Sequence, residues 1–200
     1  MAKLTSQEPE LEPLSRAQIL IAIGLTALLL LVVAKVWLRL DPLPQFPLHW
    51  SAQDLLWGAL LSAGITGGSA LLYQFWPQYR TSADWYLNFI IKPLLWPDLI
   101  WLGLLPGLSE ELLFRGVMLP ALGLDWFGLL ASSLCFGVLH MSSVKQWPYA
   151  VWAMVIGLAL GASLLLTGNL LVPVSAHILT NIIASTTWKW RSQRPSQVSS

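Results

Sequence analysis

Six apolar runs, separated by shorter polar stretches, dominate the pattern of this sequence. They cover residues 17–34, 52–75, 94–120, 124–141, 148–167 and 170–190. A helix needs roughly 20 predominantly apolar residues to cross a bilayer, and these runs are close to that length or longer. The pattern therefore predicts an all-α fold: a polytopic transmembrane helix bundle with about six spans.

The stretches between the runs predict two further features. Residues 76–93 mix polar and apolar positions, which favours a short helix lying on the membrane surface. Residues 35–51 contain three prolines and are predicted to form a loop. The middle of the run at 52–75 is rich in glycine, alanine and serine, which favours close helix packing.

The polar ends of the chain frame a single membrane domain. We expect a polar N-terminal tail at 1–16, one membrane domain at 17–190 and a polar C-terminal tail at 191–200. The first tail is acidic and no small-residue cleavage site follows the first run. We therefore interpret that run as a membrane span and not as a signal peptide.

The composition supports an integral membrane protein. Hydrophobic residues make up 56% of the chain and charged residues only 10%, against about 25% in soluble domains. The mean hydropathy is +0.63. The net charge of +1 gives no indication of a nucleic-acid partner, so membrane lipid is the expected surrounding. The single cysteine, Cys135, excludes an intrachain disulfide, and we interpret it as a small buried hydrophobic residue and not as a nucleophile.

Six spans would place both termini on the same side of the membrane. The basic residues that would lie on that side are Lys3, Arg16, Arg80, Lys92, Lys145, Lys189, Arg191 and Arg194. The other side would carry only Lys35 and Arg39. Basic residues accumulate on the cytoplasmic side, so both termini are predicted to be cytoplasmic.

The stretch "PGLSEELLFRG" places three ionisable groups inside the third run. A charge at the bilayer centre costs at least ~2.5–3.5 kcal/mol, so such groups are candidates for function. Glu111 and Arg115 are four positions apart on a helix, which favours a structural ion pair. Glu110 lies about 100° around the helix from Glu111 and needs another partner. That partner is a proton, a water, a metal or a histidine from another helix, and a free carboxylate there is suited to act as a general base.

Two later runs each carry a further polar cluster. The fourth ends in "FGVLH", with Phe136 and His140 on one helical face, and the sixth contains "HILTN", with His177 and Asn181 on one face. Taken singly, His140 is typical of a helix end, and the His177–Asn181 pair is typical of helix–helix contacts in membranes. Together with Glu110, the two imidazoles are the parts needed to activate water, with or without a metal. The spacing is not H-E-x-x-H.

The three motifs, "EELLFR" as E-E-x-x-x-R, "FGVLH" as F-x-x-x-H and "HILTN" as H-x-x-x-N, resemble the CAAX-protease and bacteriocin-processing (CPBP, ABI-type) family of intramembrane endopeptidases. The resemblance covers about residues 94–188, and we expect the motif-bearing core at 94–190. It implies an all-α membrane core that cleaves peptides near the membrane surface.

The resemblance also implies roles for the motif residues. It makes Glu110 the group that activates water, with His140 beside it, and His177 and Asn181 the groups that polarise the scissile carbonyl and stabilise its oxyanion. The members with an implied supporting role are Glu111, Arg115 and Phe136.

Members of this family are often described as metalloproteases. Glu110, His140 and His177 would be the ligands of one zinc ion with a water in the open position, or the same residues would act on water without metal. The expected substrate is a peptide or membrane protein, and the expected location is the plasma or internal membrane of a bacterium. Two alternatives remain: a non-catalytic membrane scaffold, and a proton-coupled transporter, since buried glutamate and histidine also relay protons.

The site requires residues from different depths to meet. Straight helices with a rise of about 1.5 Å per residue would leave Glu110, His140 and His177 at different levels of the bundle. We expect tilted, short or broken segments, with breaks at Pro106-Gly107 and Pro173. Glu110 and both histidines are then predicted to lie within roughly 3–8 Å of one another.

Overall fold

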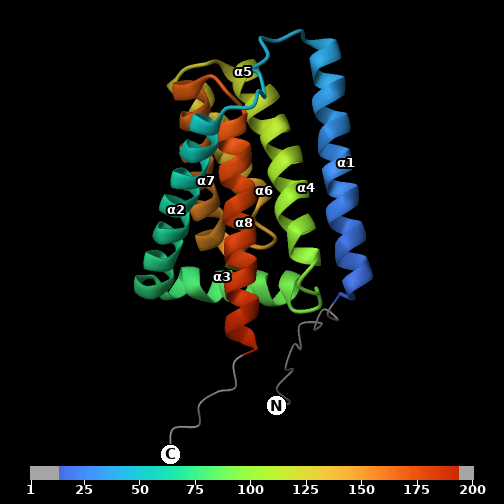
Figure 1. Ribbon diagram of the computed structural model, residues 1–200, viewed down its shortest axis with the longest axis vertical. Coiled ribbons are helices and arrows are strands. Elements are labelled where there is room, and N and C mark those ends of the chain that lie inside the picture. Colours follow the sequence, from blue (N-terminus) through green and yellow to red (C-terminus); the bar gives the residue numbers. More distant parts are fainter. Residues whose placement is uncertain (1–13, 194–200) are drawn as a thin grey trace, which may run out of the picture.

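The computed structural model describes residues 14–193, and each regular element within that range is a helix (Figure 1). The elements are α1 (Arg16–Leu40), α2 (Ala52–Phe75), α3 (Pro77–Ile91), α4 (Asp98–Leu113), η1 (Phe114–Met118), α5 (Leu119–Leu122), α6 (Trp126–Leu139), η2 (Val144–Gln146), α7 (Trp147–Thr167) and α8 (Leu171–Ser192). The predicted helical bundle is therefore confirmed. The predicted polar tails lie almost entirely outside the described residues.

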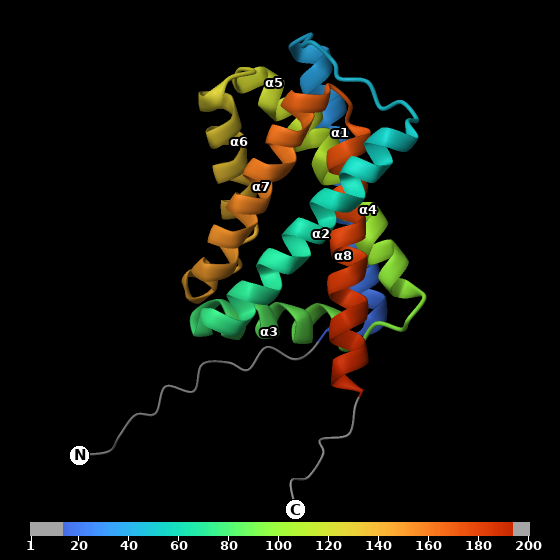
Figure 2. The same ribbon diagram turned by 60° about the vertical axis from the view of Figure 1, so that its left-hand side comes forward.

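Three of the helical segments are long and apolar enough to cross a membrane. They are α1, α2 and the segment Val144–Thr167, while α6 is a shorter apolar helix. Figures 1 and 2 show α1, α2, α4, α6, α7 and α8 running alternately between the two ends of the bundle. The start of α1 and the end of α8 consequently lie at the same end, as an even number of passes requires. Six membrane crossings, and the cytoplasmic side of this end, stay predictions.

The helix α3 lies across one end of the bundle, roughly perpendicular to the long helices (Figure 2). It occupies Pro77–Ile91, within the stretch predicted to form a surface helix. Its proline at the first turn is well placed, because that position needs no intrahelical N–H bond. Tyr79 and Ile91 on α3 are buried against the bundle, whereas Trp85 is exposed.

The third apolar run contains an irregular turn, but not at the predicted place. Pro106 lies inside α4 without ending it, and Pro173 lies in the first turn of α8, where backbone N–H groups have no intrahelical acceptor. The predicted breaks at Pro106-Gly107 and Pro173 are therefore wrong. The departure from α-helix is the single π-helical turn η1 at Phe114–Met118, which includes Arg115.

Close approach of α4 and α8 depends on two glycines. A Cβ atom on Gly103 would lie 2.4 Å from a side-chain carbon of Ile182, and one on Gly107 would lie 2.5 Å from a side-chain carbon of Ile178. Small residues of this kind let helix backbones approach in membranes. The helix that carries the two glutamates is thereby brought against the helix that carries His177.

The outer faces of the bundle are apolar. α1 buries only Ile19, Ala27 and Ala34, and its other apolar side chains are half-buried or exposed. Cys135 on α6 is also exposed, so the prediction that it is buried is wrong. The outside of a membrane bundle faces lipid, and an apolar residue there does not have to be buried in protein.

Candidate active site

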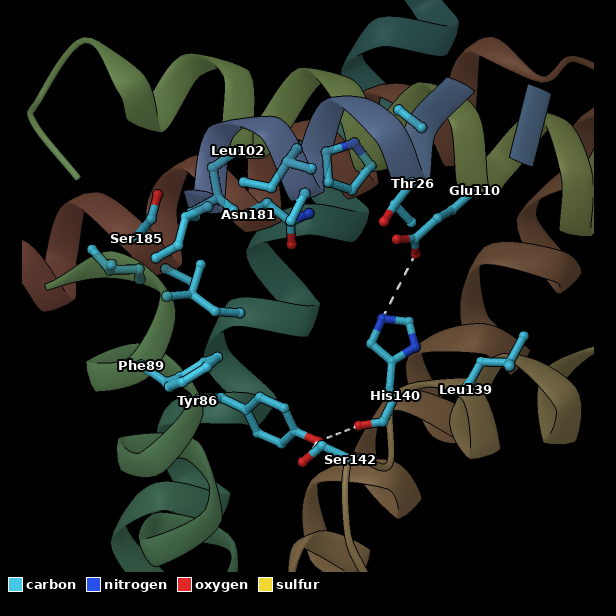
Figure 3. A pocket seen from close by; sticks show the side chains of 18 of the residues that line it. Thr26, Tyr86, Phe89, Leu102, Glu110, Leu139, His140, Ser142, Asn181 and Ser185 are labelled. Carbon is cyan, nitrogen blue, oxygen red and sulfur yellow. Dashed lines mark hydrogen bonds and ion pairs between the residues drawn. The ribbon is translucent and has the colours of Figure 1, made fainter. Parts of the chain in front are cut away.

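The four predicted catalytic residues line one cavity of about 610 Å³. Glu110 comes from α4, His140 follows α6, and His177 and Asn181 lie on α8. Figure 3 shows Glu110, His140 and Asn181 around this space, with Thr26 of α1 on the same side as Glu110. Residues up to 71 positions apart in sequence therefore share one cavity, and their catalytic roles stay a prediction.

Glu110 and His140 face each other at the wall of the cavity. The Oε2 atom of Glu110 lies 3.7 Å from Nε2 of His140, and the side chains are 16% and 27% exposed. Within the described residues, that Oε2 atom is buried and has no hydrogen-bond partner. A separation of 3.7 Å is too long for a direct hydrogen bond, and a water bound to both atoms would satisfy them.

The tautomer of His140 follows from the hydrogen bond that its Nδ1 atom makes. His140 is the residue after α6, and its Nδ1 lies 2.8 Å from the carbonyl oxygen of Phe136. A carbonyl only accepts, so Nδ1 must donate, and the neutral imidazole presents the lone pair of Nε2 toward Glu110. Because α6 has only 14 residues and ends here, His140 reaches the level of Glu110.

Glu111 points into the protein and bonds to two other side chains. Its Oε1 atom lies 2.8 Å from Nη1 of Arg115 and 2.7 Å from Nδ1 of His177, and its side chain is fully buried. The structure thus contains the expected pair of Glu111 and Arg115. We expected His177 to share a water or a metal with Glu110, yet one of its two nitrogens bonds to Glu111. The neighbouring glutamates therefore face different groups.

Arg115 and Phe136 form the packing behind the site. Arg115 also donates from Nη2 to the carbonyl oxygen of Gly157 at 3.0 Å, and its guanidinium lies 4.5 Å from the centre of the Phe136 ring. The Phe136 ring in turn lies 4.4 Å from the imidazole ring of His140 and 5.9 Å from that of His177. Phe136 therefore packs among the cation and both histidines, which explains its position in the F-x-x-x-H motif.

A second, smaller cavity adjoins the site. Its volume is about 50 Å³, and its polar lining consists of His140, Tyr149, Trp152, His177, Thr180 and Asn181. Space of this size with several polar partners is enough for a water molecule. The small cavity and the large one share His140, Tyr149, His177 and Asn181, so water has room on both sides of the histidines.

Sequence reasoning missed the contributions of α1 and α3 to the cavity. Thr26, Tyr86 and Ser142 line it with the motif residues. The one signal in the sequence was that Thr26 is a polar residue inside a very apolar run. Nothing in the local pattern around Tyr86 distinguished it from other interfacial aromatics.

Zinc binding by Glu110, His140 and His177 stays a prediction. Across residues 14–193, no group of three or more His, Cys, Asp or Glu side chains is placed to hold a metal ion. Glu110 and His140 face each other, and Nδ1 of His177 bonds to Glu111, which leaves its Nε2 as the nitrogen that can face a ligand in the cavity.

Comparison with known proteins agrees with the motifs. Residues 92–183 match the family model described as "Type II CAAX prenyl endopeptidase Rce1-like", which confirms the resemblance drawn from the sequence. The chain is also 37% identical over 87 residues to the uncharacterized protein YpbD of Bacillus subtilis (strain 168). That alignment covers 44% of this chain and 43% of YpbD, so the chain spans less than half of this relative. No solved structure matches the chain.

Proposed function

Because residues 92–183 match the Rce1-like family, we propose that this chain is an intramembrane endopeptidase that hydrolyses a peptide bond near the membrane surface. The observation that carries the proposal is the placement of Glu110 Oε2 3.7 Å from His140 Nε2, at the wall of a cavity of about 610 Å³. A carboxylate and an imidazole at this separation can hold one water between them and the cavity.

Glu110 activates that water. The carboxylate accepts one proton from the water, and the lone pair of His140 Nε2 accepts a hydrogen bond from the other hydrogen and orients the oxygen. The oxygen then bonds to the carbonyl carbon of the substrate. When the carbon–nitrogen bond breaks, the proton held by Glu110 passes to the leaving nitrogen.

Side chains of α8 stabilise the oxyanion. His177 and Asn181 lie one helical turn apart and both line the cavity, so their N–H groups can point at one substrate oxygen. His177 donates there only if Nε2 carries a proton while Nδ1 donates to Glu111.

The cavity supports an apolar substrate segment. Its lining from α1, α3 and α4 is mainly aliphatic and includes Ala22, Ile23, Leu30, Leu87, Ile90 and Leu102. Such a surface favours burial of an apolar chain beside the scissile bond at about 25 cal/mol per Å². A lipid-modified peptide, as the family description implies, or an apolar segment of a membrane protein has this character.

The location is proposed from the outer surface of the bundle and from the positions of its ends. We place the protein in a bacterial plasma or internal membrane with both ends cytoplasmic. Support comes from the apolar outer faces of α1 and α2, the common end reached by the start of α1 and the end of α8, and the basic residues predicted there.

A comparison of wild-type protein with the Glu110→Gln variant tests the function. The purified proteins are incubated with a fluorogenic peptide that carries a farnesylated cysteine followed by three residues, and new protein termini are compared in cells that express each form. Wild-type protein should cleave the peptide or generate termini that the variant does not. If both forms give the same peptide products and the same termini, the endopeptidase proposal is wrong, and a scaffold role for the polar cluster takes its place.

A further inference from the structure

We infer that Tyr86, on the surface helix α3, is a positioning residue for His140. This inference rests on the proposed function, because it concerns the alignment of the residue that orients the water. Tyr86 precedes the segment 92–183 matched by the family model.

His140 needs a support outside its own helix. It caps the C-terminus of α6 with φ −87° and ψ 0°, and the next residues up to Ser143 are not helical. The bond from Nδ1 to the carbonyl of Phe136 sets the orientation of the ring, but it belongs to the same helix end. The carbonyl groups at a helix end have no intrahelical partners, so a bond from another element can fix the backbone there.

Tyr86 supplies that support through one hydroxyl group. The hydroxyl donates to the carbonyl oxygen of His140 at 2.5 Å and accepts from the backbone N–H of Ser142 at 2.8 Å, and it lies 3.0 Å from the Ser142 side-chain oxygen. Figure 3 shows Tyr86 reaching His140 and Ser142 from the opposite wall of the cavity. The hydroxyl therefore ties two backbone groups of the loop to α3.

The ring of Tyr86 is itself held in place. It lies 4.4 Å from the ring of Tyr149 on α7 and 5.0 Å, edge to face, from that of Trp85. The edge-to-face contact with Trp85 is a favourable geometry for aromatic pairs, and the Tyr149 ring packs closely against Tyr86. The hydroxyl is therefore carried on a packed side chain, and its position relative to His140 is fixed by contacts from two helices.

The consequence is a link between the surface helix and the water-activating pair. Glu110 sits on α4, which is fixed by its packing against α8, while His140 sits on a loop tied to α3. The separation of 3.7 Å between Glu110 and His140 therefore depends on the bond from Tyr86. A shift of about 1 Å in a reacting geometry can lower a rate by up to 100-fold.

The test compares Tyr86→Phe with Tyr79→Phe. Each variant loses one hydroxyl from α3, and Tyr79 also stacks on Tyr149, at 6.5 Å, but it does not line the cavity. The Phe ring at position 86 keeps the cavity wall, so we expect kcat for the farnesylated peptide to fall by about 10-fold or more, with KM within about twofold. Tyr79→Phe should keep both values.

Hydrogen–deuterium exchange supplies a readout that does not depend on cleavage. The amide of Ser142 loses its acceptor in Tyr86→Phe and should exchange about tenfold faster, while Tyr79→Phe leaves it unchanged. Unchanged exchange in Tyr86→Phe would overturn the inference. So would a wild-type kcat in Tyr86→Phe while Glu110→Gln is inactive, which leaves the proposed function standing. Full activity in Glu110→Gln would remove the proposed function instead, and exchange alone would then decide whether Tyr86 anchors the loop.

Discussion

Glu111 and His177 are 66 positions apart in the sequence, yet their side chains share a buried hydrogen bond of 2.7 Å between Oε1 and Nδ1. The same oxygen of Glu111 also accepts a hydrogen bond of 2.8 Å from Nη1 of Arg115. This three-residue network joins α4 and η1 to α8 inside the bundle. It also separates the neighbouring glutamates, because Glu111 is enclosed by its partners while Glu110 is directed at the cavity and His140.

Replacing Glu110 should remove activity without unfolding the protein. Glu110→Gln keeps the size of the side chain but cannot accept the proton of the water. The cleavage rate per folded molecule should fall by at least ~10²–10⁴-fold, the range for loss of general acid–base catalysis. Thermal unfolding in detergent should stay at the wild-type temperature. A variant that loses activity only in proportion to its loss of folded protein would show that Glu110 is not the base.

Replacing Glu111 should lower stability and activity together. Glu111→Gln leaves the charge of Arg115 buried without its carboxylate and weakens the bond that orients His177. We expect a loss of about 3–5 kcal/mol in the free energy of unfolding, as for other broken buried pairs. The fraction that still folds should retain measurable turnover, above that of Glu110→Gln. A stable Glu111→Gln protein with no turnover would reverse the assignment of the two glutamates.

Arg115 should act on folding more than on catalysis. Arg115→Ala strands the buried carboxylate of Glu111 and removes the bond to the carbonyl of Gly157, which should also cost about 3–5 kcal/mol. The measurement is the yield of monodisperse protein and its unfolding temperature. Arg39→Ala serves as the control, because Arg39 is exposed near the end of α1. A well-folded Arg115→Ala protein with a large catalytic defect would place Arg115 in the catalytic machinery.

The contact between α4 and α8 can be tested at a glycine outside the polar network. A Cβ atom at Gly107 would lie 2.5 Å from a side-chain carbon of Ile178 and 3.0 Å from its backbone nitrogen. Gly107→Ala should push α8 away from α4, with an overpacking cost of about 1–3 kcal/mol and a loss of turnover as His177 moves. Gly64→Ala on α2 is the matched control, since its Cβ would have no neighbour within 4 Å. Equal stability and turnover in the two variants would show that the close approach is not needed.

Chelation tests whether the site works through water and side chains alone. The geometry of Glu110, His140 and His177 provides no three-ligand metal site, so dialysis against a zinc chelator should leave the cleavage rate of the farnesylated peptide unchanged. Metal content is measured on the same sample by atomic emission. A rate that falls on chelation and returns with one equivalent of zinc would overturn the metal-free mechanism.

The helices and the pair of Glu111 with Arg115 could be predicted from the sequence alone. The apolar runs are helical because apolar length and period act within each segment, and the predicted limits of α2 agree with the structure. Glu111 and Arg115 meet because residues four apart share a helical face, whatever the rest of the chain does. The three motifs also identified the four polar residues Glu110, His140, His177 and Asn181 that line the cavity, since ionisable groups are rare inside apolar helices.

The connections between those residues depend on the tertiary structure and could not be predicted from the sequence. The bond of His177 to Glu111, and not to Glu110, depends on how far α4 and α8 approach and rotate against each other. The level of His140 depends on where α6 ends, and its anchoring depends on Tyr86 in a helix that carries no motif. These relations are set by packing between segments far apart in the chain, and the periodicity within one segment contains no information about its neighbour's depth or rotation.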